Sequence, residues 1–179
     1  MTTAVSPDSS TPFDAVADAM NDFVAGHDPR GRVLAGSDEE SMARFCYVLA
    51  LYETQARAGR VPSRLDRLSS SSSVDEHLGF VDEAEVADLS ALGQAFVDAY
   101  RGEFYQPVTA NPRFALSRQL GGADGDLIVN GCLVDLKTTT DLSMARRVGY
   151  QLVGYLLADT DDEHRIGRVG FYLARPAAS

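Results

Sequence analysis

The sequence predicts an α/β fold, in which a helical N-terminal half precedes a mixed β-sheet flanked by helices. Two observations lead to this prediction. Apolar residues in the first half recur at the three- and four-residue spacing of amphipathic helices. From Phe104 onward, short apolar runs around an Asn-Gly turn signal are typical of strands, and one helical segment separates the last two of these runs.

Two helices are expected in the first sixty residues. Apolar residues at helical spacing predict a short helix over Phe13 to Val24. A second helix is expected to start at Ser37, which would act as its N-cap while Glu40 closes a capping box. This helix is expected to run to about Ala58, because Gly59 is a typical C-terminal stop.

The rest of the first half contains a tail, a loop and a further helix. Residues 1–12 are polar and are expected to form a disordered tail. Val61 to Val74 combines a proline, several arginines and a serine run, which is typical of a loop or a mobile linker. Asp82 to Tyr100 has apolar residues on one side and acidic residues around it, so a third helix is predicted there.

The second half is expected to form the sheet. Strands are predicted at Arg113 to Gln119, Asp126 to Val129, Cys132 to Leu136 and Arg168 to Ala174. A helix from about Met144 to Ala158 is predicted between the last two strands. Residues 13–179 are therefore expected to form one domain, mainly helical over 13–103 and sheet-forming over 104–175.

Composition restricts the classes of function. The net charge of −10 argues against binding of nucleic acid by the whole surface, although it leaves room for a local basic groove. No apolar run approaches the ~20 residues of a membrane helix, and the N-terminus lacks the pattern of a signal peptide. Cys46 and Cys132 lie far apart within apolar patterns and are typical of core thiols. A cytoplasmic protein without membrane contact is expected.

The Asn-Gly pair at residues 130–131 is a strong hairpin signal and sets a register. A two-residue turn places Asp126 opposite Asp135 and Asp124 opposite Lys137. Alternation then makes one face of the hairpin apolar. The other face gathers three carboxylates and Lys137, the only lysine of the chain, at the end away from the turn.

Like charges on neighbouring strands repel, so a fold that keeps them close needs a neutralising group. Mg²⁺ is such a group, since it is held by one or two carboxylates, water and substrate phosphate, and it acidifies a bound water. Lys137 could hold that water or stabilise the developing charge. The alternative is that these charges are solvated, with Asp124 and Lys137 forming a surface ion pair.

Two helical features have a functional and a structural interpretation. Gln151 and Tyr155 lie one turn apart, on a side of their helix that is expected to face the protein. They belong either to the site or to a core in which backbone groups satisfy them. Glu53 falls on the expected apolar side of its helix, where a glutamate is unusual unless it is paired or binds metal. The alternative is a helix-edge glutamate paired with Arg57.

Three short motifs follow one another in the second half. They are Gly122-Ala123-Asp124-Gly125-Asp126-Leu127-Ile128, Val134-Asp135-Leu136-Lys137-Thr138 and Gln151-Leu152-Val153-Gly154-Tyr155. Together they resemble the motifs of the PD-(D/E)XK nuclease superfamily, in particular its RecB-like branch, on the expected strand, strand and helix. The match covers about Phe114 to Arg175. The resemblance implies a restriction-endonuclease-like fold, with a central mixed sheet flanked by helices.

The resemblance also implies a metal site. Asp126 and Asp135 would be ligands of Mg²⁺, with Mn²⁺ as a second suitable ion, and the Leu136 carbonyl would be a third ligand. Lys137 would be the catalytic lysine. DNA would be the substrate.

Four further residues receive roles from the resemblance. Gln151 and Tyr155 would support the site or contact substrate phosphate. Glu53 matches the position from which an early helix supplies an additional acid. Asp124 would assist Asp126 in binding metal or replace it.

Three functional hypotheses follow. The first is a metal-dependent nuclease that cleaves phosphodiester bonds, with phosphate contacts from Arg113, Arg118, Arg146, Arg147 and the cluster from Arg57 to Arg67. The second is a catalytically silent or partner-dependent relative that binds nucleic acid or a protein, with a second copy of the chain as one candidate partner. The third is a plain acidic interaction domain. Metal binding separates the third from the others, and strand cleavage separates the first from the second.

Overall fold

The computed structural model describes residues 11–27, 34, 36–59, 64–69, 71–100, 108–139, 143 and 145–175. The chain divides into two compact units, Met1–Gly93 and Gln94–Ser179, and each is described by itself. Residues 1–10 of the expected disordered tail lie outside the described residues, whereas Pro12 already belongs to a helix. The single domain expected over residues 13–179 stays a prediction.

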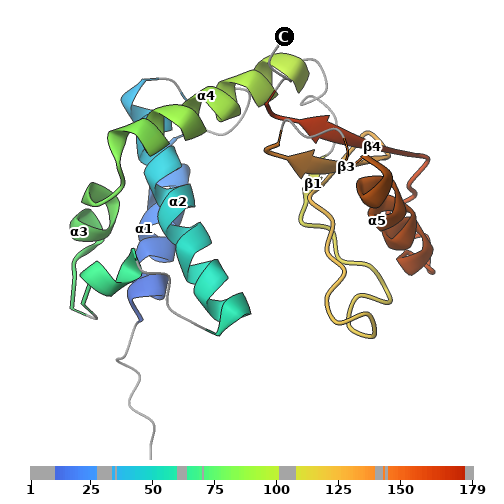
Figure 1. The fold of residues 1–179 in the computed structure, drawn as a ribbon, viewed down its shortest axis with the longest axis horizontal. Helices are drawn as coiled ribbons and strands as arrows, with labels where there is room; N and C mark the ends of the chain where they lie inside the picture. The colour runs from blue at the N-terminus through green and yellow to red at the C-terminus, as the bar shows by residue number, and fades with distance from the viewer. Residues whose placement is uncertain are drawn as a thin grey trace, which may run out of the picture. The chain divides into compact units, whose positions relative to one another are not determined.

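The first unit is helical, as predicted (Figure 1). It contains α1 (Pro12–Gly26), α2 (Ser37–Ala58), the 3₁₀ turn η1 (Leu65–Arg67), α3 (Val74–Gly79) and the first part of α4 (Glu83–Tyr100). The three helices expected in the first half of the chain are thereby confirmed as α1, α2 and α4. Part of the segment predicted to be a loop instead forms η1, and α3 begins at its last residue.

Capping boxes explain where two of these helices begin. The Thr11 hydroxyl accepts a hydrogen bond from Asp14 N at 3.2 Å, while the Asp14 carboxylate accepts one from Thr11 N at 2.8 Å. Ser73 and Glu76 form the same reciprocal pair at the start of α3. Each box satisfies two backbone donors that a helix start leaves free. The last residue of the serine run, Ser73, is therefore the N-cap of α3, which the sequence analysis did not predict.

The start of α2 differs from the prediction. Ser37 is the first helical residue rather than the N-cap, and no side chain caps this end. Gly36 occupies the cap position with a φ of +59°, which glycine adopts without steric cost. The capping box expected between Ser37 and Glu40 is therefore wrong. The predicted stop is confirmed, since Gly59 has a φ of +64° and donates to the Gln55 carbonyl.

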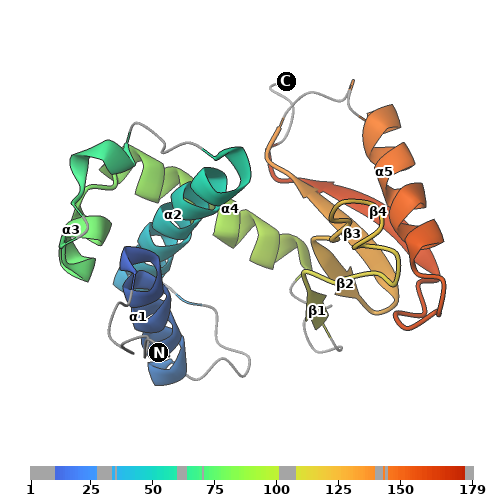
Figure 2. The same ribbon diagram turned by 90° about the horizontal axis from the view of Figure 1, so that it is seen from below.

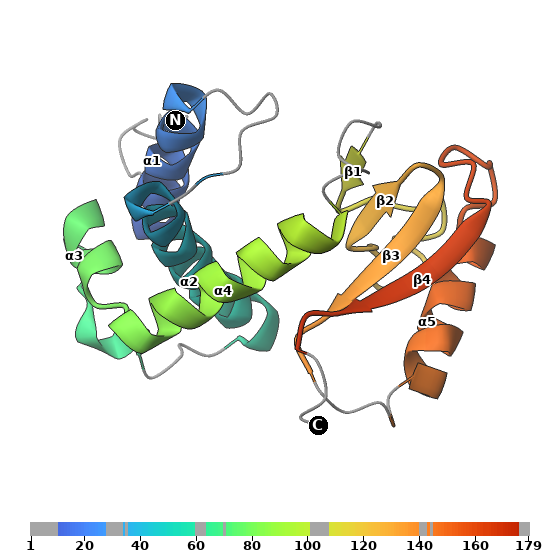
Figure 3. The same cartoon turned by 90° about the horizontal axis from the view of Figure 1, so that it is seen from above.

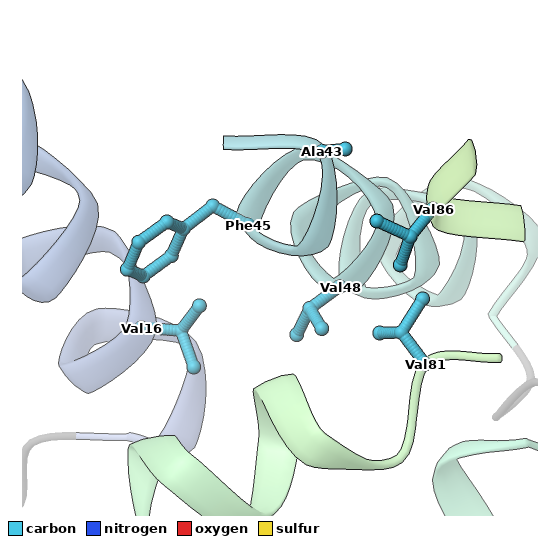
Figure 4. Close-up of a cluster of buried hydrophobic side chains, with 6 residues drawn as sticks. All are labelled: Val16, Ala43, Phe45, Val48, Val81 and Val86. Atoms are coloured by element: carbon cyan, nitrogen blue, oxygen red, sulfur yellow. The ribbon is translucent and has the colours of Figure 1, made fainter. Parts of the chain in front are cut away.

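The core of the first unit lies between α1, α2 and the start of α4 (Figure 4). Its buried side chains are Val16, Ala43, Phe45, Val48, Val81 and Val86. Val16 comes from α1 and faces Val48 of α2, while Val81 precedes α4. His77 of α3 is also buried, and its Nε2 lies 2.7 Å from the Tyr52 hydroxyl. A buried polar ring with this partner is a satisfied core residue.

The second unit holds a mixed sheet with the order β1-β2-β3-β4, covered on one face by a helix (Figure 2, Figure 3). The strands are β1 (Val108–Ala110), β2 (Leu127–Val129), β3 (Cys132–Lys137) and β4 (Arg168–Leu173), and the helix is α5 (Ala145–Ala158). β1, β2 and β3 are successively antiparallel, whereas β4 runs parallel to β3. The α/β fold class and three of the four predicted strands are confirmed. Within the described residues, no helix is long and apolar enough to cross a membrane.

The strand predicted over Arg113 to Gln119 is wrong. Residues 115–121 form consecutive turns, and Arg113 contributes only an isolated bridge to Asp124. Phe114 and Leu116 have the alternation of a strand, but both pack into the cluster beneath α5 from this turn. The position beside β2 is filled instead by β1, which the sequence analysis did not identify.

The hairpin of β2 and β3 has the predicted register. Leu127 pairs with Val134, and Val129 pairs with Cys132. Residues 130–131 have φ values of +49° and +67°, as a type I′ turn requires. The antiparallel ladder ends at Leu127, however, so the expected pairing of Asp126 with Asp135 is not part of it. The pairing expected between Asp124 and Lys137 is wrong, since Asp124 bridges to Arg113.

The two faces of the hairpin bury different clusters. One face packs Ile128 and Leu133 against Val148 and Leu152 of α5. The opposite face is lined by Leu127, Val129 and Val134, against which Phe96 and Tyr172 pack. The hairpin therefore has apolar cover on both sides. Because side chains alternate, Asp135 and Lys137 lie on the face beneath α5.

The turn provides a test of this register. Gly131→Val should lower the free energy of unfolding by about 1–2 kcal/mol, because a β-branched residue resists positive φ. Gly167→Ala is the matched control, since the φ of Gly167 lies outside the left-handed region and nothing would contact its Cβ. Urea unfolding followed by circular dichroism measures both. Equal stability of the two variants would contradict the assigned turn.

Candidate metal-binding site

Asp135 is the most buried carboxylate among the described residues of the second unit. Its side chain is 2% exposed on β3, and the Lys137 ammonium lies 2.6 Å from its Oδ2. Among the described residues, Oδ2 has this charge contact but accepts no hydrogen bond. Burial of a carboxylate is costly unless positive charge and hydrogen bonds compensate for lost water. Asp135 is therefore a buried anion whose neighbour at Oδ2 is the Lys137 ammonium, at a distance short enough for a charge-assisted interaction.

Asp126 comes to the same place from the other strand. It stands immediately before β2, and its Oδ2 accepts a hydrogen bond from Leu136 N at 2.7 Å. β3 extends past the last residue that pairs with β2. The Asp126 carboxylate therefore accepts the hydrogen bond from Leu136 N that a carbonyl of a neighbouring strand would otherwise accept. The N–H and C=O of one strand residue point to the same neighbour. The Leu136 carbonyl is therefore directed toward the side on which Asp126 lies.

A close backbone approach holds Asp126 in position. A Cβ on Gly125 would lie 2.9 Å from a Leu133 methyl and 3.0 Å from Pro112 Cγ, both in the buried interior. Gly125 N also donates to the Pro112 carbonyl at 3.0 Å. Only glycine fits here without a shift of its neighbours. The Asp-Gly-Asp sequence thus needs its central glycine to bring Asp126 against β3.

Asp124 has a different environment from Asp126. It is exposed, and its Oδ1 accepts a hydrogen bond from the Ser117 hydroxyl at 3.0 Å. The same Ser117 oxygen accepts from Ala123 N at 2.9 Å, so this group closes the turn that precedes β2. Asp124 thus has a structural role in the loop, which the sequence analysis did not foresee.

Gln151 and Tyr155 are brought together on α5, as predicted. Gln151 Nε2 donates to the Tyr155 hydroxyl at 2.6 Å. The Tyr155 ring stacks on Phe114 at 5.3 Å between centroids, and the edge of His164 meets Phe114 at 5.4 Å. Gln151 is exposed rather than buried, so the core interpretation of this residue is wrong. Sequence reasoning missed the supporting roles of Phe114, which its alternation assigned to a strand, and of His164, which belongs to no regular pattern.

Glu53 belongs to the first unit. Its side chain is 59% exposed, and its Oε1 lies 2.6 Å from Arg57 Nη2. The buried side of α2 is formed instead by Ala43, Phe45 and Val48. The expectation that Glu53 faces the core is therefore wrong, and the pairing with Arg57 is observed.

The candidate phosphate-binding arginines fall into two groups. Arg113 and Arg118 are exposed beside a surface hollow that Phe114, Ser117 and Asp124 also line. Arg146 and Arg147 are exposed on the first turn of α5, in the same unit.

The other group, from Arg57 to Arg67, is partly engaged. Arg57 pairs with Glu53, and Arg64 contacts both Glu85 and the Tyr47 hydroxyl. Arg60 and the side chain of Arg67 lie outside the described residues. The exposed arginines of the second unit are thus the better candidates for phosphate contacts.

The residues present fit a hard cation, although their number is small. In the part of the chain that the structure describes, no group of three or more Asp, Glu, His or Cys side chains is placed to hold a metal ion. Mg²⁺ does not require such a group, because it keeps several waters and uses one or two carboxylates. Asp126, Asp135 and the Leu136 carbonyl meet that lower requirement.

Comparisons with known proteins do not assign the chain. No protein-family model, no curated protein and no solved structure matches it. The functional interpretation therefore depends on the geometry of this site and on the resemblance of its three motifs.

The position of Asp126 can be tested through its neighbour. Gly125→Val should lower the free energy of unfolding by about 1–3 kcal/mol, because the added side chain overpacks the contact with Pro112 and Leu133. Gly167→Val is the control, since its Cβ would enter open space and its φ lies outside the left-handed region. Thermal unfolding measures both variants. An equal loss in Gly167→Val would contradict a special role for the close approach.

The buried charge gives a test that does not depend on activity. Lys137→Met leaves Asp135 buried without its counter-charge, which should lower the free energy of unfolding by about 3 kcal/mol in chelator. Saturating Mg²⁺ should then stabilise this variant by about 3 kcal/mol at a hundredfold excess over Kd. The double variant Asp135→Asn/Lys137→Met removes both charges and should show little response to Mg²⁺. Unfolding of Lys137→Met that is insensitive to Mg²⁺ and Mn²⁺ would argue against a metal site.

Proposed function

We propose that the chain is a metal-dependent nuclease that hydrolyses phosphodiester bonds, with DNA as its substrate. The observation that carries the proposal is the buried Asp135 carboxylate, which faces Lys137 and lies next to the Leu136 amide that holds Asp126. Two acids and one lysine at neighbouring ends of two strands form a constellation suited to metal-assisted hydrolysis.

The arrangement of elements supports a restriction-endonuclease-like fold as part of the same proposal. Three antiparallel strands are followed by α5 and by a parallel fourth strand. Asp126 immediately precedes β2, Asp135 and Lys137 lie on β3, and Gln151 and Tyr155 lie on α5. The three motifs thus occupy three consecutive elements, β2 with the residue before it, β3 and α5.

The metal ligands would be Asp126, Asp135 and the Leu136 carbonyl, with Mg²⁺ as the ion and Mn²⁺ as its substitute. When bound, the cation supplies positive charge that polarises a phosphoryl oxygen and acidifies a water. Asp126 is already oriented by the Leu136 amide, so little reorganisation is needed to present its second oxygen. Asp124 and Glu53 are left out of this ligand set, because Ser117 and Arg57 engage them.

Lys137 has the charge and the exposure that a catalytic lysine needs. Its side chain is 23% exposed, so it reaches from the buried Asp135 toward solvent. The ammonium would orient the attacking water or stabilise negative charge that develops on the phosphoryl group. A compact ammonium can serve in a narrow site where the planar fork of arginine does not fit. This explains why the only lysine of the chain stands here.

Gln151 would contact the substrate, and Tyr155 would position it. Stacking on Phe114 fixes the Tyr155 ring, and the Tyr155 hydroxyl in turn holds one N–H of Gln151. The amide keeps a second N–H and its carbonyl for a phosphate or a base. Arg113 and Arg118, which line the hollow beside Phe114, would supply local positive charge, which an acidic chain needs to hold a polyanion.

Cleavage of end-labelled single- and double-stranded DNA tests the proposal. Wild-type protein should cut in Mg²⁺ or Mn²⁺ and not in chelator, whereas Lys137→Ala should be at least about a thousandfold slower, since it loses a charge in the water-poor site. Asp126→Asn should be similarly slow. Asp161→Asn is the matched control, because Asp161 is an exposed acid outside the site.

The other outcomes are informative. Cutting that survives in Lys137→Ala would show that another site or a contaminant is responsible. If the wild type binds Mg²⁺ but cuts neither DNA nor RNA, a silent or partner-dependent protein becomes the better account.

A further inference from the structure

The outer side of α5 carries an apolar seam. Tyr150, Val153 and Leu157 are 73%, 48% and 70% exposed, although all three are large apolar or aromatic side chains. Their spacing of three and four residues places them on one line along the helix, opposite the buried Val148 and Leu152. This is the spacing with which one helix packs against another.

The surface around the seam is suited to close packing. Gly154 is exposed on the same side, and a Cβ there would meet nothing within 4 Å. Glycine is a poor helix former, and on a helix surface it permits the close approach of a second backbone. Leu156, Val169 and Phe171, on the flank of α5 and on the edge strand β4, are each about two fifths exposed. The apolar surface is thus broader than one row of side chains.

The charges at the ends of α5 are reversed relative to its own dipole. Arg146 and Arg147 stand in the first turn, which contains no acidic residue. Acidic residues follow the last turn, at Asp159, Asp161, Asp162 and Glu163. A helix is stabilised by acids at its start and bases at its end, so each set of charges is at the unfavourable end. An antiparallel neighbour with the same charges would correct both ends at once.

We propose that the α5 seam binds a second copy of this chain, with the two α5 helices antiparallel about a two-fold axis. Tyr150 of one copy then lies near Leu157 of the other, and Gly154 allows the helices to approach. The arginine pair of each copy meets the acidic segment that follows α5 in its partner. The seam is self-complementary, as an isologous interface requires.

Charge explains why a second copy is the favoured occupant. Two chains with a net charge of −10 repel in general, so association requires a patch where opposite charges meet. In an antiparallel pair of α5 helices, the basic start of each copy lies beside the acidic end of the other. The pair therefore contains two patches where opposite charges meet. An acidic partner would be repelled by residues 159–163, and a basic one by the arginine pair. This inference stands apart from the proposed nuclease activity, because oligomeric state is measured without substrate.

Light scattering coupled to size-exclusion chromatography tests the seam. Over about two decades of concentration around the micromolar range, the mass should rise from 19.3 kDa toward twice that value. Leu157→Glu should raise the dimer dissociation constant at least about tenfold. Leu120→Glu is the matched control, since it adds the same charge to an exposed leucine of the same unit outside α5. Circular dichroism would verify that both variants fold.

A charge exchange tests the antiparallel pairing. Arg146→Glu/Arg147→Glu and Asp161→Arg/Glu163→Arg should each be monomeric where the wild type is dimeric, and an equimolar mixture should dimerise. Wild-type association should weaken as salt rises, because the end charges attract. A monomer at every concentration would overturn the proposal. So would a dimer that Leu157→Glu leaves intact, an equal loss in Leu120→Glu, or a mixture that does not associate.

Discussion

The buried carboxylate of Asp135 is the interaction on which the account of the second unit depends. It can be held beneath α5 only because Lys137 lies 2.6 Å away and because apolar side chains such as Leu133 and Leu152 build the layer around it. Burial of an anion at this position lowers the free energy of unfolding, because an apolar residue of similar volume would give a more stable core. A second carboxylate, that of Asp126, is fixed by the backbone amide of the next residue, Leu136. These two carboxylates are the ones that the proposed metal site uses.

Much of the fold was predictable because local signals were strong. Apolar spacing identified α1, α4 and α5, Gly59 marked the end of α2, and the Asn-Gly turn set the hairpin register. The failures occurred at turns and helix ends rather than within regular elements. Phe114 and Leu116 alternate as in a strand but pack from a turn, and Gly36 replaces Ser37 as the cap of α2. Alternation over so few residues does not distinguish a strand from a turn whose side chains pack inward.

The candidate site was predictable where its residues share a strand or a helix. Asp135 and Lys137 are two residues apart on β3, so alternation alone places them on one face. Their contact and the burial of Asp135 required the structure, because these depend on the cover that α5 provides. Asp124 was not separable from Asp126 by sequence, since the difference lies in a hydrogen bond from Ser117 within an irregular turn. Contacts of this kind leave no periodic signal.

The most direct test of the account is a crystal structure of the wild-type protein grown with Mn²⁺, with anomalous scattering recorded to locate the ion. The account predicts an anomalous peak at 2.0–2.4 Å, roughly, from oxygens of Asp126 and Asp135 and from the Leu136 carbonyl, with water completing the coordination. Lys137 should lie beside this ion rather than on Asp135 alone. A crystal in which Mn²⁺ binds elsewhere while Lys137 and Asp135 remain a closed pair would contradict the central claim.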